Sequence, residues 1–338
     1  MIVVTGGAGF IGSNLISGLN KNGFENIILV DDLTRTDKIK NISDLRVNDY
    51  LDKHEFLSAL DRNQLGTVSS IFHLGACSDT MVSDGRYVME NNFTYSKQIY
   101  EYCQEHLTQY IYASSASVYG ANTVFAEHPE NERPLNAYAY SKFLFDRYVR
   151  SRDADKKSQV VGLRYFNVYG YREQHKPKMA SVAFHFYNQY RKFGKVKLFE
   201  GSDGYANGEQ RRDFVFVDDI VSANLYFMNN PDKNGIFNIG TGQCRPFNAV
   251  AEAVVNTLAE RDGKGSRTLE EIVSAGEIEY IPMPEILHGK YQSFTEANLS
   301  QLRSVGYTNA FASVEEGTRL YVQWLLKNDA EEACLACH

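Results

Sequence analysis

Hydrophobic runs alternate with amphipathic segments through the first half of the chain. Unbroken apolar runs fall at residues 2–5, 27–30, 70–76, 110–115 and 160–166, with the sequences IVVT, IILV, SIFHLGA, YIYASS and VVGLRYF. Such continuous runs are typical of parallel strands that helices cover on both faces. Strands that alternate with helices in this way predict an α/β fold built on a Rossmann-type, doubly wound parallel sheet.

The pattern changes after residue 168, where loops lengthen, strands shorten and polar insertions interrupt the chain. Two later apolar stretches, FVFV at 214–217 and FNIG at 237–240, are predicted to be strands that return to the main sheet. Ser313 and Glu316 form a capping-box pattern ahead of a final amphipathic helix with the sequence VEEGTRLYVQWLL.

These patterns predict two domains in the chain. A dinucleotide-binding Rossmann domain is expected to comprise residues 1–168 and 212–240. A smaller mixed α/β domain for the substrate is expected to comprise residues 169–211 and 241–328, so it is built from C-terminal segments. Residues 329–338 are predicted to form a disordered tail.

Charge and composition exclude several classes of partner. The formal net charge is −7 and no polybasic tract occurs, so neither nucleic acid nor an anionic membrane surface is an expected partner. No apolar run reaches the roughly 20 residues of a transmembrane helix. Residues 2–5 already have the pattern of a strand, which leaves no room for a signal peptide. The protein is therefore expected in the cytoplasm.

The cysteines predict neither a disulfide framework nor a metal site. Five cysteines is an odd number, and they are scattered through the chain. The last five residues, CLACH, match a haem-attachment pattern, and Cys334, Cys337 and His338 could offer three metal ligands. No fourth ligand is evident, and short motifs of this kind arise often by chance. No bound metal is expected.

A glycine-rich loop, VTGGAGFIGSN, follows the first strand and opens a helix. Gly6, Gly9 and Gly12 provide a tight turn, a close approach of backbone to a diphosphate and close helix packing. Asp31 ends the next strand, where an acid that binds ribose is expected. The combination predicts a dinucleotide site.

The residues leave the choice between NAD and NADP open. Asp31 favours a free 2′-hydroxyl and hence NAD. The loop after it is basic, with Arg35, Lys38 and Lys40, and Lys53 lies just beyond the next strand. Lysines there could pair with the 2′-phosphate of NADP, or they could simply belong to a solvated loop.

The segment NAYAYSKFLF contains a candidate catalytic pair. Tyr138 and Lys142 are four residues apart and share one face of a helix, whereas Tyr140 and Lys142 do not. A neighbouring ammonium would stabilise the phenolate of Tyr138. Ser115 ends a strand at the carboxyl edge of the sheet, where it can hydrogen-bond a reacting hydroxyl. We expect Ser115, Tyr138 and Lys142 to act together and Tyr140 to pack, although Tyr-x-x-x-Lys also occurs on solvated helices.

With these residues in place, the chain resembles the extended short-chain dehydrogenases/reductases over nearly its whole length. The matching segments are GGAGFIG, HLGACS, SSASVYG, RYFNVYG and RRDFVFVDD, together with the tyrosine–lysine pair. Within that superfamily it is most similar to the ADP-L-glycero-D-manno-heptose 6-epimerases of lipopolysaccharide inner-core synthesis. The segments that carry this closer resemblance are LDKHEF, HLGACSDT, PLNAYAYSKFLFD, REQHKPKMASVAFH, KLFEGS and GKYQSFT.

The resemblance implies an isomerase that interconverts ADP-D-glycero- and ADP-L-glycero-D-manno-heptose. Hydride would leave C6″ from one face and return to the other, with a tightly held, recycled NADP in place of NAD. The implied cofactor contacts are Gly6, Gly9, Phe10, Ile11, Gly12, Asp31, Asp32, Lys38, Lys53, Leu74, Gly75, Ala76, Cys77, Ser78, Asn91 and Lys142. It also implies a homo-oligomer, and the family resemblance suggests a pentamer.

The resemblance also implies the substrate contacts and a second acid/base, Lys176. In the rival interpretation, Lys176 belongs to a solvated basic loop that merely attracts a diphosphate. A desolvated lysine can act as a base. The implied substrate contacts are Asn167, Lys176, Lys178, His185, Phe199, Glu200, Gly201, Ser202, Arg212 and Tyr291. Asp213 and Asp218 are expected to be structural anchors.

Two departures from the family pattern affect this site. Tyr171 stands where extended members usually have proline, so we expect a less rigid loop before Lys176. The stretch GYANGEQ lengthens the loop between Ser202 and Arg212, which bears on the reach of Arg212.

Three other functions compete with this interpretation. A UDP-hexose 4-epimerase would keep the same three catalytic residues and is the main alternative. A dehydratase would need an acidic pair after Ser115, where Ala116 and Ser117 stand. A dinucleotide-binding regulator would not need the catalytic residues at all.

Overall fold

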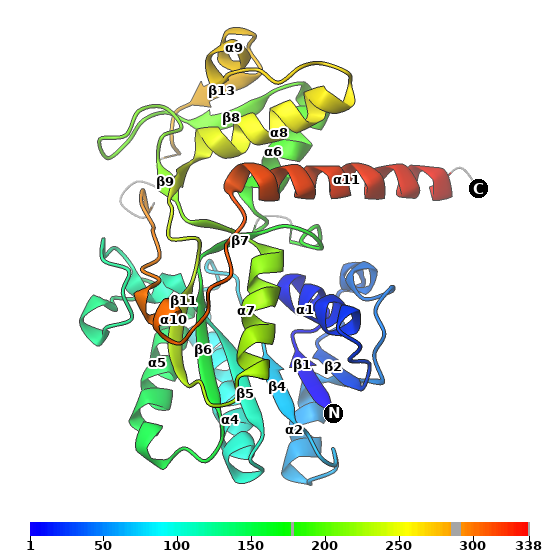
Figure 1. Cartoon of the computed structure of the whole chain (residues 1–338), viewed down its shortest axis with the longest axis vertical. Coiled ribbons are helices and arrows are strands. Elements are labelled where there is room, and N and C mark those ends of the chain that lie inside the picture. The colour runs from blue at the N-terminus through cyan, green and yellow to red at the C-terminus, as the bar shows by residue number, and fades with distance from the viewer. Residues whose placement is uncertain (177–178, 285–291, 337–338) are drawn as a thin grey trace. The chain divides into compact units, whose positions relative to one another are not determined.

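The computed structural model of the 338-residue chain describes residues 1–176, 179–284 and 292–336, with side chains to residue 330 (Figure 1). The chain divides into two compact units. The first comprises Met1–Phe166, Ile220–Ile239 and Asn298–Asn309, and the second comprises Asn167–Asp219, Gly240–Ala297 and Ala310–His338. Compared with the predicted domains, residues 212–219 lie in the second unit and residues 298–309 in the first.

The first unit is built on one seven-stranded sheet in which every pairing is parallel. Its strand order is β11-β6-β5-β4-β1-β2-β3. The order reverses between β1 and β4, the point at which doubly wound folds bind their ligands. The predicted fold class is confirmed. The strands are β1 (Ile2–Thr5), β2 (Ile27–Asp31), β3 (Asp49–Asp52), β4 (Ser70–His73), β5 (Gln109–Ser115), β6 (Val160–Tyr165) and β11 (Gly235–Ile239).

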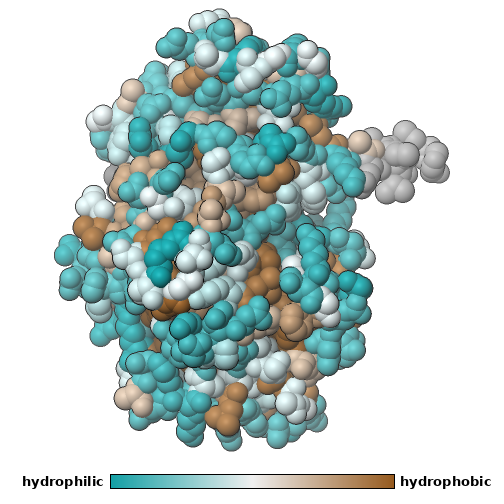
Figure 2. Space-filling model, viewed as in Figure 1, coloured by the Kyte–Doolittle hydropathy of each residue, from teal (hydrophilic) through white to brown (hydrophobic). Residues whose placement is uncertain are grey.

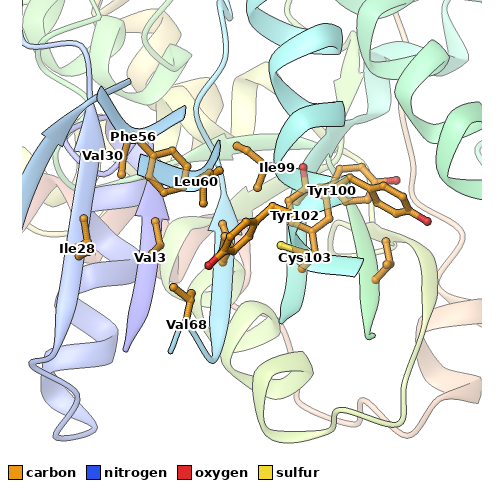
Figure 3. Packing of buried hydrophobic residues seen from close by; sticks show 14 of the residues in the cluster. Val3, Ile28, Val30, Phe56, Leu60, Val68, Ile99, Tyr100, Tyr102 and Cys103 are labelled. Atoms are coloured by element: carbon orange, nitrogen blue, oxygen red, sulfur yellow. The ribbon is translucent and has the colours of Figure 1, made fainter. Parts of the chain in front are cut away.

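Helices cover both faces of this sheet. On one face, side chains of α2, α4 and α5 join the sheet in a continuous buried cluster, which includes Phe56, Ile99 and Phe145 (Figure 3). On the other face α1 meets α7 so closely that a Cβ at Gly18 would lie 2.4 Å from Val221 Cγ1. The helices are α1 (Phe10–Lys21), α2 (Lys53–Asp61), α3 (Gly85–Met89), α4 (Tyr95–Glu105), α5 (Ala137–Ser151), α7 (Val217–Asn229) and α10 (Ser300–Ser304).

Among its described residues, the second unit holds three two-stranded sheets, β10-β7, β12-β9 and β13-β8. Their strands are β7 (Asn167–Tyr169), β8 (Val196–Phe199), β9 (Arg211–Arg212), β10 (Phe214–Phe216), β12 (Arg245–Pro246) and β13 (Ile278–Ile281). The helices are α6 (Val182–Phe193), α8 (Phe247–Arg261), α9 (Leu269–Ser274) and α11 (Val314–Ala336).

Two local predictions differ from this arrangement. The prediction that residues 214–217 return to the main sheet is wrong, because β10 pairs with β7 while β11 pairs with β6. An apolar run specifies burial but not the neighbouring strand. Helix α11 continues through Ala336, where a disordered tail is predicted from residue 329. Its start has the expected cap, since the Glu316 amide donates to Ser313 Oγ at 3.2 Å.

Polar residues make up most of the face shown in Figure 2. Large hydrophobic side chains that are well exposed are scattered, as at Met81, Leu107 and Phe193. Within the described residues, no helix has both the length and the apolar character that crossing a membrane requires.

Candidate active site

The glycine loop connects β1 to α1 in a conformation that excludes side chains. Gly6 has φ +67°, and a Cβ there would lie 2.7 Å from the Gly75 amide nitrogen. A Cβ at Gly12 would lie 2.1 Å from the Gly6 carbonyl oxygen. Gly9 precedes α1 without a side-chain cap, and the first turn of α1 has no acidic residue. A bare helix N-terminus behind a glycine cradle suits the diphosphate of a dinucleotide.

Asp31 holds this loop to the basic segment that follows β2. Its Oδ2 accepts from the Ala8 amide at 2.8 Å, and its Oδ1 accepts from Lys38 Nζ at 2.8 Å. The same Oδ1 accepts from the Asp32 amide at 2.7 Å. Asp31 is buried, so these bonds fix the carboxylate beside the place where an adenosine ribose is expected.

A second lysine completes this cluster from β3 and the start of α2. Lys53 Nζ lies 3.1 Å from Asp32 Oδ2 and donates to Asn91 Oδ1 at 3.3 Å. Hydrogen bonds from Thr34, together with Lys53, lower the pKa of Asp32 to about 2. The structure thus brings together Asp31, Asp32, Lys38, Lys53 and Asn91, all five of which the sequence analysis assigns to the cofactor.

The loop that carries Leu74, Gly75, Ala76, Cys77 and Ser78 is fixed by a residue that the sequence analysis missed. Asn92 accepts from the Cys77 amide at 2.7 Å and donates to the Cys77 carbonyl at 3.0 Å. It also donates to Ser141 Oγ at 3.0 Å, which lies one residue before Lys142. Asn92 is fully buried in a π-helical turn, Glu90–Thr94. An asparagine within a helix was the available clue, since Asn disfavours helix interiors.

The three candidate catalytic residues lie in the same unit, at the end of β5 and on α5. Ser115 Oγ accepts from the Ser117 amide at 3.2 Å. Burial raises the pKa of Tyr138, and a hydrogen bond with Ser115 opposes that rise. The Lys142 ammonium donates to the Ala113 carbonyl at 2.7 Å. Tyr140 does not pack as expected, because 46% of it is exposed.

Lys142 is a buried cation. It is only 4% exposed, and burial lowers its pKa to about 8, against an opposing effect of Asp146. Because the pKa of the folded form lies below the ordinary value of 10.5, burial of the ammonium costs stability below pH 8. That cost disappears as the pH rises from 8 towards 10.5.

We therefore expect Lys142→Met to raise the free energy of unfolding by about 1–3 kcal/mol at pH 7 while it abolishes activity. The gain over the wild type should shrink between pH 8 and 10.5. Urea unfolding at pH 7 and pH 10 measures the gain in the free energy of unfolding at each pH. A gain that grows with pH would contradict this account of Lys142.

A buried network of charged side chains stabilises α5. Arg164 is fully buried; its Nε donates to Asp146 Oδ2 at 2.9 Å, and its Nη2 donates to Glu132. Asp146 also accepts from Tyr112 at 2.9 Å and from Ser114 at 2.9 Å. Asp146 lies one helical turn after Lys142, and Ser114 immediately precedes Ser115. The network joins α5 to the strand end that carries Ser115.

In the second unit a cavity of about 660 Å³ brings together Asn167, His185, Phe199 and Arg212, four of the residues assigned to the substrate. Arg212 is 6% exposed, and its guanidinium lies 5.7 Å from the Phe247 ring centre. Arg212 therefore lies in the wall of this cavity, and its reach to a diphosphate stays a prediction. The cavity is lined by Asn167, Val168, Met179, Ala180, Ser181, Val182, His185, Phe186, Gln189, Lys197, Leu198, Phe199, Gly208, Gln210, Arg212, Phe214, Phe247 and Ile281.

The remaining candidates have other positions. Glu200, Gly201 and Ser202 follow β8 directly and are not in the cavity wall. Lys178 and Tyr291 lie outside the described residues, as do Cys337 and His338. Asp213 is an anchor, as expected: its buried carboxylate accepts from the amides of Thr241 at 2.7 Å, Gly242 at 2.9 Å and Ala297 at 2.9 Å.

The loop that carries Lys176 is closed by a buried glutamate. Glu173 is fully buried and accepts from the amide and the hydroxyl of Ser181, both at 2.6 Å. Burial lowers the pKa of Lys176, and the charge of Glu173 opposes that effect. Tyr171 stands at the start of this loop, and its ring packs 5.2 Å from Phe216 and 5.4 Å from Trp324. A packed aromatic side chain thus stands where the family pattern has proline.

Comparison with known proteins agrees with this geometry. Residues 2–240 match the NAD dependent epimerase/dehydratase family. The chain is 57% identical over 327 residues to the ADP-L-glycero-D-manno-heptose-6-epimerase of Thiobacillus denitrificans, an alignment that spans 96% of this chain and 98% of the relative. The resemblance expected from the sequence motifs is confirmed.

Two solved structures have the same fold. The ADP-L-glycero-D-manno-heptose-6-epimerase of Helicobacter pylori is 30% identical, with a TM-score of 0.79 over 96% of each chain. The UDP-glucose 4-epimerase of Thermotoga maritima, solved with UDP-glucose, is 27% identical, with a TM-score of 0.76 over 97% of this chain and 99% of that one. The chain therefore belongs to the NAD dependent epimerase/dehydratase family and is an epimerase that uses a nicotinamide cofactor.

Proposed function

We propose that the chain interconverts ADP-D-glycero-D-manno-heptose and ADP-L-glycero-D-manno-heptose at C6″, and so supplies heptose for the lipopolysaccharide inner core. The observation that carries this proposal is the 57% identity to a heptose 6-epimerase over 96% of the chain. The cavity that gathers Asn167, His185, Phe199 and Arg212 supports it, because it is large enough for a nucleotide sugar.

The proposed chemistry assigns one task to each catalytic residue. The glycine loop would hold a nicotinamide cofactor, which would supply the removal of hydride from C6″ and its return to the same carbon. Ser115 hydrogen-bonds the C6″ hydroxyl of one epimer, and Tyr138 takes the proton of that hydroxyl on oxidation and supplies it when the same epimer is re-formed. Lys142 stabilises the Tyr138 phenolate while that proton is away. We propose Lys176 as the acid/base for the other epimer, since burial lowers the pKa of this half-buried lysine and so favours its neutral, basic form.

The test of this function needs no added cofactor. Purified protein is incubated with ADP-D-glycero-D-manno-heptose, and the two C6″ epimers are separated by chromatography. Conversion to a mixture of epimers supports the substrate and a retained cofactor together. If UDP-glucose is epimerised and the heptose is not, even with NADP and NAD added, the heptose assignment falls and a UDP-hexose 4-epimerase takes its place.

We propose NADP as the bound cofactor. Lys38 and Lys53 place two ammonium groups against the carboxylates of Asp31 and Asp32, beside the expected adenosine ribose. A 2′-phosphate there would find two cationic partners.

We therefore expect Lys38→Met to weaken NADP binding by about tenfold or more and NAD binding by much less. Lys21→Met, which makes the same charge change at the end of α1, is the control. Fluorescence titration of the protein with each cofactor measures both affinities. Equal weakening of NAD and NADP would contradict the assignment of Lys38 to the 2′-phosphate.

The loop of Lys176 offers a prediction about pH. The charge of Glu173 raises the pKa of Lys176 against the stronger effect of burial, so Glu173→Gln should lower that pKa further. We expect the rising limb of kcat against pH to move to lower pH by about half a unit or more. A uniform loss of kcat with an unmoved limb would show that Glu173 serves only the structure of the loop.

We also propose that the chain works as a homo-oligomer in the cytoplasm, as its resemblance to the heptose epimerases suggests. Multi-angle light scattering of the active protein measures the number of subunits, and an active monomer would contradict the oligomer.

A further inference from the structure

The loop between β8 and β9 is longer than the family pattern led us to expect, yet it is firmly held. The Gly201 amide donates to Asn207 Oδ1 at 2.9 Å, and the Gly208 amide donates to the Phe199 carbonyl at 3.0 Å. Asn248 Nδ2 donates to the Asn207 carbonyl at 2.9 Å. Gly208 has φ +68°, and a Cβ there would lie 2.2 Å from Asn248 Oδ1. The longer loop is therefore held in place, and its residues Gly208 and Gln210 line the cavity.

Gln210 closes this loop and lines the cavity, although it is only 2% exposed. Its Nε2 donates to the Glu200 carbonyl at 2.9 Å and to Ser202 Oγ at 3.2 Å. Because a backbone carbonyl only accepts, the nitrogen of the amide must face Glu200. Both amide hydrogens are thereby committed. The oxygen, Oε1, accepts no hydrogen bond from the part of the chain that the structure describes, so it is the atom left for a ligand.

The walls of this cavity suit an aromatic base. The rings of Phe199, Phe214 and Phe247 line the same cavity, and Arg212 provides a buried positive charge for a phosphate. A fixed acceptor in such a cavity favours a base that presents a donor. Adenine presents an exocyclic amine, whereas a 6-oxo purine presents a carbonyl oxygen at the same place.

We propose that Gln210 selects adenine in the substrate by accepting a hydrogen bond from its exocyclic amine through Oε1. This inference rests on the proposed function for the kind of ligand and adds a specificity-determining residue to it. The firm support of Gln210 by Glu200 and Ser202 matters, because a carboxamide that is free to turn could present either its oxygen or its nitrogen.

ADP and IDP test the proposal, because their bases differ by an amine or an oxygen at C6. Calorimetric titration of the wild-type protein should give an affinity for ADP about tenfold or more above that for IDP. In Gln210→Leu the ratio should fall to within about threefold. A wild-type protein that binds the two alike contradicts the proposal. So does a Gln210→Leu variant in which both affinities fall by the same factor, as a merely loosened loop would produce.

Gln189 provides a matched control in the same cavity. The Oε1 of Gln189 already accepts from the Lys197 amide at 2.8 Å, so we do not expect Gln189 to recognise the base. Gln189→Leu should leave the ratio of ADP to IDP affinity as in the wild type. If the ratio of ADP to IDP affinity falls as far as in Gln210→Leu, the loss of either glutamine side chain has the same effect and Gln210 has no special role.

The two proposals can fail separately. A protein that prefers ADP to IDP but epimerises no ADP-heptose keeps the role of Gln210 and loses the proposed substrate. A protein that epimerises ADP-heptose and binds ADP and IDP alike keeps the function and loses the role of Gln210.

Discussion

Replacing Tyr138 by phenylalanine should lower kcat for epimerisation by about 10²–10⁴-fold while the substrate still binds. The phenol is the group that exchanges a proton with the substrate hydroxyl in the proposed chemistry. Phenylalanine keeps the ring and removes only the hydroxyl group that carries that proton. Steady-state kinetics with ADP-D-glycero-D-manno-heptose measure kcat and KM separately.

Tyr140→Phe is the matched control for this result. Tyr140 lies two residues further along α5, is 46% exposed, and its ring lies 6.0 Å from that of Phe143. Loss of its hydroxyl should change kcat by less than about twofold. If Tyr138→Phe retained the wild-type kcat, the catalytic role of Tyr138 would have to be abandoned.

Arg164→Met should destabilise the protein by about 3–5 kcal/mol. The substitution leaves the buried carboxylates of Asp146 and Glu132 without their shared cation. Chemical denaturation at pH 7 measures the free energy of unfolding. Arg319→Met is the control, because Arg319 pairs with Glu316 on the surface and its loss should cost about 1 kcal/mol or less.

The contribution of Arg164 to stability should become smaller in acid. Burial raises the pKa of Glu132, but Arg150 and Arg164 outweigh burial, so the pKa lies below its ordinary value of 4.5. The paired carboxylate therefore stabilises the fold above pH 4.5, and this contribution is lost as the pH falls below that value. The difference in the free energy of unfolding between the wild type and Arg164→Met should become smaller in acid. A difference in the free energy of unfolding that grows in acid would contradict the ion-pair account.

The strands of the main sheet could be predicted from the sequence because burial on both faces produces long apolar runs. The pairing of residues 214–217 could not, since a short apolar stretch is equally compatible with the main sheet and with β7. The end of α11 could not either, because its last turns lack the apolar periodicity that marks a buried helix.

The candidate site was predictable where a residue type is tied to local geometry. Gly6 and Gly12 stand where a Cβ would collide with backbone, and Tyr138 and Lys142 share a helix face. Asn92 was missed because its role comes from partners distant in sequence, and Glu173 and Gln210 were missed because they bond across irregular loops to partners 8 to 10 residues away. Asn92, for example, joins Cys77 to Ser141, 15 and 49 residues away.

The central claim is that one active site oxidises and re-reduces C6″ with a cofactor that stays bound. The most direct measurement uses ADP-D-glycero-D-manno-heptose that carries deuterium at C6″, incubated in ordinary water with the purified protein. The mass of the recovered ADP-L-glycero-D-manno-heptose then reports the fate of that atom. We predict that the product keeps its deuterium at C6″, because the hydride removed from that carbon returns to it. Exchange of the deuterium for solvent hydrogen would contradict the account and indicate epimerisation by proton removal.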